Sequence, residues 1–272
     1  MCCEEKRKSY YWLLRIINKS DVKFYSKGQI KFGKPLNWIK QGDGRNDIFE
    51  GALAIELANE KRKYTNCKNH PRTLQEEIIG KYRIIRDVRT LNVPTLCFYG
   101  LEEKNGRIDV PDKYFTDFCD CREDYCIIVI EAKSFYNELQ KSLNKIGFNN
   151  ELFFHSIIYE NKNTGYNVYP QFPYELLRKD EDRYSHQNEA RMLVVSENKD
   201  LIDIFDRNDY IVNIDINNII HGFLEVPTDN EKVIITINNN ELFIDLKWIF
   251  RLNSAINSQL ESHLFTWIEP LN

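Results

Sequence analysis

The sequence lacks the motifs that mark the commonest nucleotide-binding and hydrolase folds. It contains neither GxGxxG nor GxxxxGK[ST], which argues against a Rossmann or P-loop nucleotide site. It also lacks GxSxG, the nucleophile elbow of α/β-hydrolases. No run of 18 apolar residues occurs, so we expect no transmembrane helix. The first residues, MCCEEKRKSYYWLLRIIN, mix acids with bases and break their apolar run, so we expect no secretory signal and a cytoplasmic protein.

Cysteine is present, but not in the spacing that binds zinc. The seven cysteines form an odd number without a secretory signal, which is typical of reduced cytoplasmic thiols. Cys119 and Cys121 are followed by Cys126 and suggest a metal site, but no CxxC pair occurs and Cys126 opens the apolar run CIIVI. We therefore predict buried or surface thiols and no metal.

Composition predicts one folded domain, and the charge is unevenly spread. Hydrophobic residues make up 42% and aromatic residues 13%, enough for a sizeable core, and no Pro/Gly/Ser linker interrupts residues 1–272. Residues 1–100 carry 20 Lys and Arg against 11 Asp and Glu, whereas the remaining 172 carry 17 against 30. This asymmetry indicates either that the first part faces an anionic partner or that two complementary parts pack together.

Short apolar stretches separated by polar turns favour an α+β fold with mixed or antiparallel sheets and flanking helices. Residues 10–17 and 50–58 fit either a strand or a helix. Further strands are expected at 29–33, 93–99, 126–131, 153–159, 191–195, 210–214, 219–222, 233–237 and 242–248. Helical segments are expected at 22–27 (closed by Gly28), 134–146 (capped by Ser134) and 250–264, whereas 174–178 fit a short helix or a loop and 201–205 a helix or a turn.

Two early segments carry charged residues in unusual places. Arg15 lies inside an apolar run, so it needs a carboxylate or phosphate partner if it is buried, or it faces outward from a strand. The loop GRNDIFEG, residues 44–51, holds Arg45, Asp47 and Glu50 between glycines. Such a loop is either a site or a solvated turn with a local pair from Arg45 to Asp47 or Glu50.

The stretch RYSHQNEARMLVV, residues 183–195, carries the densest polar signal. Every second residue of a strand shares a face, so Gln187, Glu189 and Arg191 are predicted to project together. Glu189 is then placed to stabilise a ribosyl oxocarbenium ion, and Gln187 to orient an acceptor through its amide. Arg191 either binds a phosphate or pairs with Glu189 at a strand edge. Neighbours on a strand diverge, so Ser185 and His186 are not expected to form a catalytic pair.

These residues resemble the DUF2971-like proteins, a large and mostly uncharacterised microbial family. The early resemblance lies in IKFGKP, residues 30–35, and in residues 45–51. The later one lies in Lys179, Tyr184, Gln187, Glu189 and Arg191. That family is similar in layout to ADP-ribosyltransferase-like folds. The resemblance implies that Glu189 and Gln187 are catalytic and that Arg15, Arg45, Arg191 and Tyr184 bind NAD. It also implies a nucleic acid or non-arginine protein acceptor. The Ser-Thr-Ser strand of such enzymes has no clear counterpart, because Gly33 stands at the usual Ser position.

The leading hypothesis is therefore an ADP-ribosyltransferase that uses NAD, acting as a toxin or antiviral effector with a neutralising antitoxin or sensor protein as partner and without a membrane. One alternative is a nucleic-acid- or nucleotide-binding module in which Tyr10, Tyr11 and Trp12 stack on bases. Another is a metal-independent RNase that uses His186 or His155 with Lys179.

Overall fold

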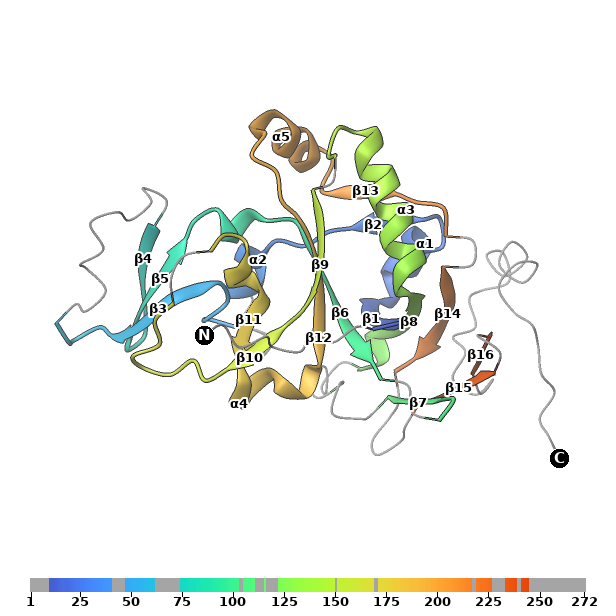
Figure 1. The fold of residues 1–272 in the computed structure, drawn as a ribbon, viewed down its shortest axis with the longest axis horizontal. Coiled ribbons are helices and arrows are strands. Elements are labelled where there is room, and N and C mark those ends of the chain that lie inside the picture. The colour runs from blue at the N-terminus through green and yellow to red at the C-terminus, as the bar shows by residue number, and fades with distance from the viewer. Residues whose placement is uncertain are drawn as a thin grey trace, which may run out of the picture. The chain divides into compact units, whose positions relative to one another are not determined.

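The computed structural model describes residues 10–40, 47–61, 74–102, 105–110, 115, 122–149, 151–168, 171–216, 219–226, 233–238 and 241–244 (Figure 1). These residues divide into two compact units. Unit 1 takes residues 1–31, 97–150 and 211–272, and unit 2 takes residues 32–96 and 151–210. The expectation of a single domain over residues 1–272 stays a prediction.

Unit 1 is built on an antiparallel sheet in the order β14–β8–β1–β6. Its strands are β1 (Trp12–Asn18), β6 (Thr95–Leu101, which enters the unit at Cys97), β8 (Tyr125–Glu131) and β14 (Ile220–Glu225). The smaller elements are α1 (Val22–Tyr25), β2 (Gln29–Lys31), β7 (Arg107–Val110), β13 (Ile211–Asn213), β15 (Val233–Asn238) and β16 (Glu241–Ile244).

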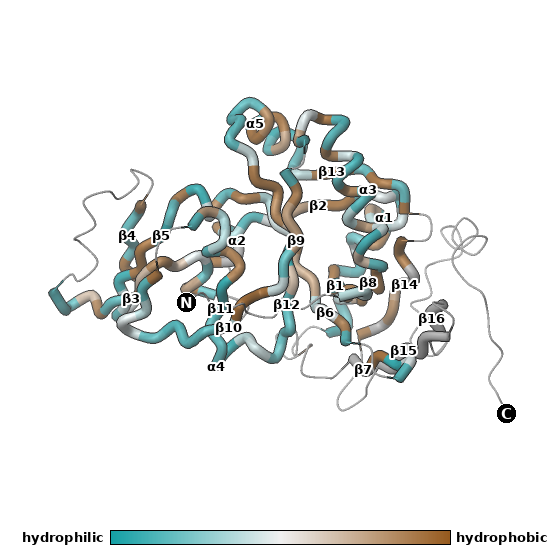
Figure 2. Tube along the Cα trace, viewed as in Figure 1, coloured by the Kyte–Doolittle hydropathy of each residue, from teal (hydrophilic) through white to brown (hydrophobic). Residues whose placement is uncertain are grey.

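The centre of this sheet is β8, whose residues 126–130 are fully buried. This confirms the predicted strand with two covered faces, and its hydrophobic run is visible in Figure 2. Helix α3 (Ala132–Lys145) packs beside β8 through residues spaced three or four apart, and Phe135 meets Phe98 of β6 edge to face. The helix begins two residues before the predicted cap. Glu131, rather than Ser134, caps it by accepting a hydrogen bond from the Ser134 N–H at 3.1 Å.

Unit 2 contains an antiparallel sheet in the order β3–β5–β4, an antiparallel pair β12–β9 and a parallel pair β10–β11. Its strands are β3 (Ala52–Leu57), β4 (Leu74–Ile79), β5 (Tyr82–Asp87), β9 (Leu152–Ser156), β10 (Ile158–Glu160), β11 (Arg178–Asp180) and β12 (Glu189–Val194). Its helices are α2 (Pro35–Lys40), α4 (Glu181–Tyr184) and α5 (Lys199–Arg207). Short 3₁₀ helices occur at Lys19–Asp21 in unit 1 and at Thr90–Asn92, Tyr174–Leu177 and Ser185–Gln187 in unit 2.

Several predicted segments change form in the structure. Of residues 50–58, which fitted either a strand or a helix, Ala52–Leu57 form strand β3. The strand predicted at 153–159 splits at Ile157 into β9 and β10, because the Ile157 N–H donates to the Glu189 carbonyl and the chain changes partner there. The hairpin of β4 and β5 was not predicted, although Gly80 adopts a positive φ of 58° in its turn. The helix predicted at 250–264 lies outside the described residues.

The chain is thus α+β, with mostly antiparallel sheets and a few short helices. Gly28, which closes α1, must be glycine for two reasons. Its φ is 72°, and a Cβ at this position would lie 2.0 Å from the Ile214 carbonyl oxygen. Among the helices that the structure describes, none has the length and apolar character needed to cross a membrane.

Candidate functional site

The candidate site lies in unit 2 and begins with the segment from Asp47 to Gly51. The Asp47 carboxylate accepts a hydrogen bond from the Phe49 N–H at 2.9 Å, which is the local turn that Asp favours. Gly51 then takes a φ of 64°, and β3 begins at the next residue. The Phe49 ring is buried in a cluster with Ala52, Ile55 and Ile84 and lies edge to face with Tyr82. The apolar anchor therefore holds Asp47 and Glu50 in fixed positions, and both are buried.

Glu189 and Arg191 come from β12 and share one face of the strand, as predicted. The Arg191 Nε lies 2.5 Å from the Glu189 Oε1, so the Glu–Arg pair that the sequence left open is formed. Gln187 departs from the prediction. It belongs to a 3₁₀ helix, and Asn188 adopts a left-handed conformation with φ 45° and ψ 48° between that helix and the strand. The every-second-residue row therefore begins only at Glu189.

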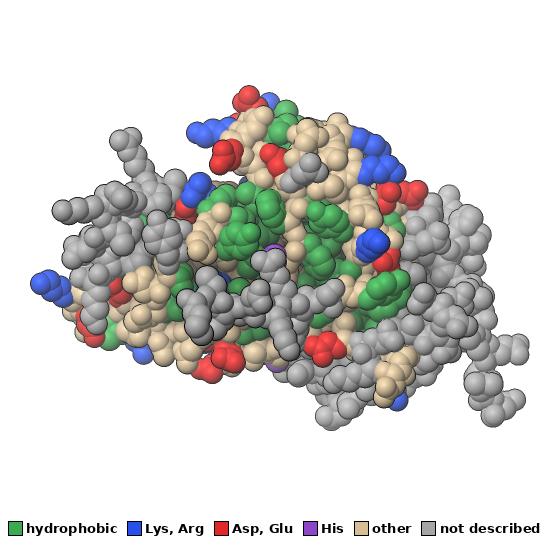
Figure 3. Space-filling view, viewed as in Figure 1, with side chains coloured by type: hydrophobic (Ala, Val, Ile, Leu, Met, Phe, Trp, Pro, Cys, Tyr) green, Lys and Arg blue, Asp and Glu red, His purple; other side chains and the backbone are tan. Residues whose placement is uncertain are grey.

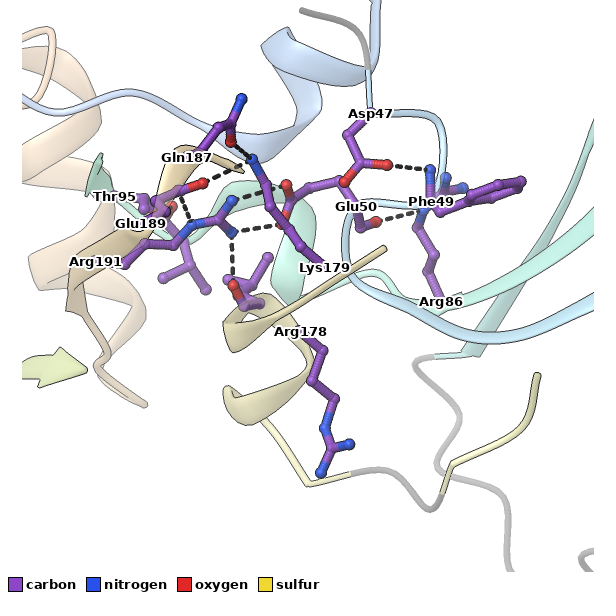
Figure 4. Close-up of polar contacts among 12 residues, drawn as sticks. Asp47, Phe49, Glu50, Arg86, Thr95, Arg178, Lys179, Gln187, Glu189 and Arg191 are labelled. Carbon is purple, nitrogen blue, oxygen red and sulfur yellow. Dashed lines mark hydrogen bonds and ion pairs between the residues drawn. The ribbon is translucent and has the colours of Figure 1, made fainter. Parts of the chain in front are cut away.

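Arg191 is the centre of a buried ion-pair network (Figure 4). Its side chain is fully buried, and its Nη1 and Nη2 bind the two oxygens of Glu50 at 2.5 and 2.9 Å. Nη1 also donates to the Leu176 carbonyl at 2.5 Å. All three guanidinium nitrogens are thus engaged by the protein, which gives Arg191 a positioning role, and the phosphate contact expected of it stays a prediction.

Lys179 of β11 joins Gln187 to Glu189. Its Nζ lies 2.6 Å from the Glu189 Oε2 and donates to the Gln187 Oε1 at 2.9 Å. The same ammonium lies 4.7 Å from the centre of the Tyr184 ring. The structure therefore brings Gln187 and Glu189 together through a lysine rather than along a strand.

Two further cations border the network. Lys162 is almost fully buried and donates to the carbonyls of Phe49 and Arg178 at 3.2 and 2.6 Å. Arg86 donates to the Glu50 carbonyl at 2.9 Å and to that of Ile48, and it pairs with Glu77 at 2.8 Å. Neither cation was predicted. Lys162 lies in the polar run ENKN, which carries no signal of burial.

The network shifts the pKa values of Glu189 and Asp47 in opposite directions. Burial alone would raise the pKa of Glu189, but the charges of Arg191 and Lys179 outweigh it and lower that pKa to about 2. Burial and the neighbouring Glu50 raise the pKa of Asp47. Burial lowers the pKa of Lys162, whereas the Glu189 charge raises the pKa of Lys179 against the effect of its own burial.

Acid unfolding is expected to report the Glu189 ion pairs. Because the folded pKa of about 2 lies below the ordinary glutamate pKa of 4.5, the contribution of these ion pairs to stability is complete above pH 4.5 and is lost as pH falls toward 2. Within this window Glu189 should contribute a slope approaching about 1.4 kcal/mol per pH unit. Denaturant titrations from pH 2 to 6 should show this slope in wild type and a smaller one in Glu189→Gln. Equal slopes would contradict the ion-pair assignment.

The other residues expected at the site have different environments. Arg15 belongs to unit 1, where its Nη1 donates to the Cys97 carbonyl at 3.1 Å and its guanidinium lies beside the rings of Tyr25 and Phe98. Arg45 lies outside the described residues. Tyr184 is buried beside Lys179.

The hydrolase and metal signals find little support in the described residues. Ser185 and His186 lie in a 3₁₀ helix rather than on the strand assumed from the sequence. Cys97 is half-buried and Cys126 is buried, whereas Cys119 and Cys121 fall outside the described part of the chain. Within the described part, no group of His, Cys, Asp and Glu side chains has the arrangement of a metal site.

The arrangement supplies a buried carboxylate that two cations keep ionised, with an amide bound to one of these cations. Such a group can stabilise a developing positive charge without needing to reorganise. Comparisons with protein-family models, with curated proteins and with solved structures gave no match, and the resemblance to DUF2971-like proteins stays a prediction.

Proposed function

We propose that this protein is an ADP-ribosyltransferase-like enzyme that cleaves the nicotinamide–ribose bond of NAD. It passes ADP-ribose to a macromolecule, either a nucleic acid or a protein side chain other than arginine. The supporting observation is the state of Glu189, whose carboxylate is kept ionised by two buried cations and lies next to Gln187 through the shared Lys179. An ionised carboxylate is what an oxocarbenium-like transition state requires.

Each part of the proposed site has one role. Glu189 stabilises the positive ribosyl carbon, and Gln187 positions the acceptor. Arg191 and Lys179 fix the carboxylate, because both bind it within 2.6 Å. The resemblance assigns the phosphate contacts to Arg45, and Tyr184 lies beside Lys179. In this proposal the protein acts in microbial conflict, as a toxin or antiviral effector that an antitoxin or sensor controls.

The nucleic-acid-binding alternative has less support. Two of its three stacking rings, Tyr10 and Trp12, are only 7% and 2% exposed, whereas Tyr11 is 53% exposed. The described Lys and Arg side chains in Figure 3 are scattered among acids instead of forming one basic stripe. In the RNase alternative, Lys179 would need to leave the buried Glu189 and the half-buried Gln187 to reach a phosphate.

NAD turnover in Glu189→Gln tests the proposed function. Glutamine keeps the shape of the side chain but removes its charge, so turnover and label transfer from NAD should fall by about 10²–10³-fold. Purified protein is incubated with NAD labelled in the adenylate part, together with RNA, DNA and a protein extract as acceptors. Nicotinamide release and acceptor labelling are then measured.

The matched control is Glu56→Gln. Glu56 of β3 is another buried acid of unit 2, and its Oε2 lies 3.2 Å from the Nη1 of Arg83. The turnover of this variant should stay near that of wild type. Undetectable turnover in wild type with every acceptor, or equal turnover in wild type and Glu189→Gln, would refute the proposed function.

A further inference from the structure

Asp47 holds an open hydrogen-bonding position inside the network. The residue is 3% exposed, and its Oδ1 is engaged by the Phe49 N–H. Its Oδ2 is buried and has no hydrogen-bond partner among the residues that the structure describes. Buried carboxylate oxygens are normally satisfied, so an open one needs an explanation.

The groups that face Asp47 come from several elements of unit 2. Glu50 approaches from the same segment, and Figure 4 shows Asp47 and Glu50 together on the side of Arg191 opposite Glu189. The other groups that act on it electrostatically are Lys162, Lys179, Arg86 and Tyr184. Burial and Glu50 oppose the ionised carboxyl, whereas Lys162 and Lys179 favour it, and the balance raises the pKa of Asp47.

Asp47 and Glu189 are therefore two carboxyls of one network with different surroundings. Glu189 is held by two ion pairs and keeps its charge, whereas Asp47 has an open oxygen and a proton affinity above that of an ordinary aspartate. Two carboxyls whose surroundings separate their protonation are typical of acid–base assignments in active sites. Glu50 cannot take this part, because Arg191 binds both of its oxygens.

We propose that Asp47 is the general base of the transfer, taking through its open Oδ2 the proton of the attacking acceptor group. This inference rests on the proposed function. In the step, an O–H or N–H group of the acceptor forms a bond to the ribosyl carbon. The bond from that carbon to nicotinamide breaks, and nicotinamide leaves as a neutral molecule with the electron pair. The released proton moves to Asp47, which becomes a carboxylic acid.

The test compares the pH dependence of ADP-ribose transfer in wild type and Asp47→Asn. In wild type the rate should rise with pH as Asp47 loses its proton, at a pH above the ordinary aspartate range. Asp47→Asn should lower the rate by about 10²-fold or more and remove that rise. The amide oxygen of asparagine can still accept the Phe49 hydrogen bond, so the variant should fold, and circular dichroism with thermal unfolding checks this.

Glu175→Gln is the matched control. Glu175 is also buried, accepts the Gln171 N–H at 2.6 Å and has a second oxygen without a hydrogen-bond partner among the described residues. Its charged neighbours, however, are Asp87 and Arg89 rather than the network. Its rate and pH profile should match wild type.

The outcomes separate this inference from the proposed function. Transfer that is lost in Glu189→Gln but unchanged in rate and pH profile in Asp47→Asn overturns the role of Asp47 alone. A wild-type profile that is flat from pH 4 to 8 does the same, even if Asp47→Asn does not fold. Absence of NAD cleavage in wild type overturns both.

Discussion

Replacing Arg191 with methionine is expected to lower the free energy of unfolding by about 3–5 kcal/mol. The guanidinium is fully buried and is the shared partner of Glu50 and Glu189. Methionine fills a similar volume but leaves two buried carboxylates without their main counterion. The cost of burying an unpaired charge, rather than the loss of one contact, produces the large effect. Equilibrium denaturation at pH 7 measures it.

The matched control for this prediction is Arg178→Met. Arg178 pairs with Glu160 at 2.8 Å, but the two side chains are 26% and 25% exposed, so solvent screens the pair. Its loss should cost about 1 kcal/mol or less. A double-mutant cycle of Arg191→Met with Glu50→Gln should show strong coupling, because Glu50→Gln removes one of the stranded charges. Costs of similar size for Arg191→Met and Arg178→Met would contradict the network.

Replacing Phe49 with alanine is expected to cost about 3–5 kcal/mol. The ring is 2% exposed, packs with Ala52, Ile55 and Ile84, and lies 5.2 Å from the Tyr82 ring centre. Its removal leaves a cavity directly beneath the segment that carries Asp47 and Glu50. The variant should therefore lose stability and also loosen the Glu50–Arg191 pair. Denaturation curves measure the first effect.

Loosening of the pair has its own readout. In a Phe49→Ala background, the coupling energy between Glu50 and Arg191 should be smaller than in wild type. The surface control is Phe153→Ala on β9, where the side chain is 39% exposed and the expected cost is well under that of Phe49→Ala. An unchanged coupling energy would show that Phe49 does not hold the segment in place.

Local patterns were enough to predict much of the secondary structure. Alternation and apolar runs predicted β8, β12 and the α+β class, and Gly28 marked the end of α1 correctly. These features depend on residues a few positions apart, where helix and strand periods act directly. The hairpin of β4 and β5 escaped prediction because its strands mix charged residues, among them the buried Arg83 and Arg86, with apolar ones.

The sequence by itself determined that Glu189 and Arg191 share one face of a strand, because side chains two positions apart on a strand project to the same side whatever surrounds them, and the structure then showed that they pair. Only the tertiary structure decided the partners from distant segments. Glu50 is 141 positions from Arg191, and Lys179, rather than alignment along a strand, connects Gln187 with Glu189. The tertiary structure also decided that Lys162 is buried and that an Asp47 oxygen stays open within the described residues. The physical reason is that burial and ion pairing depend on which distant segments pack together, and the spacing of residues within one helix or strand carries no information about that packing.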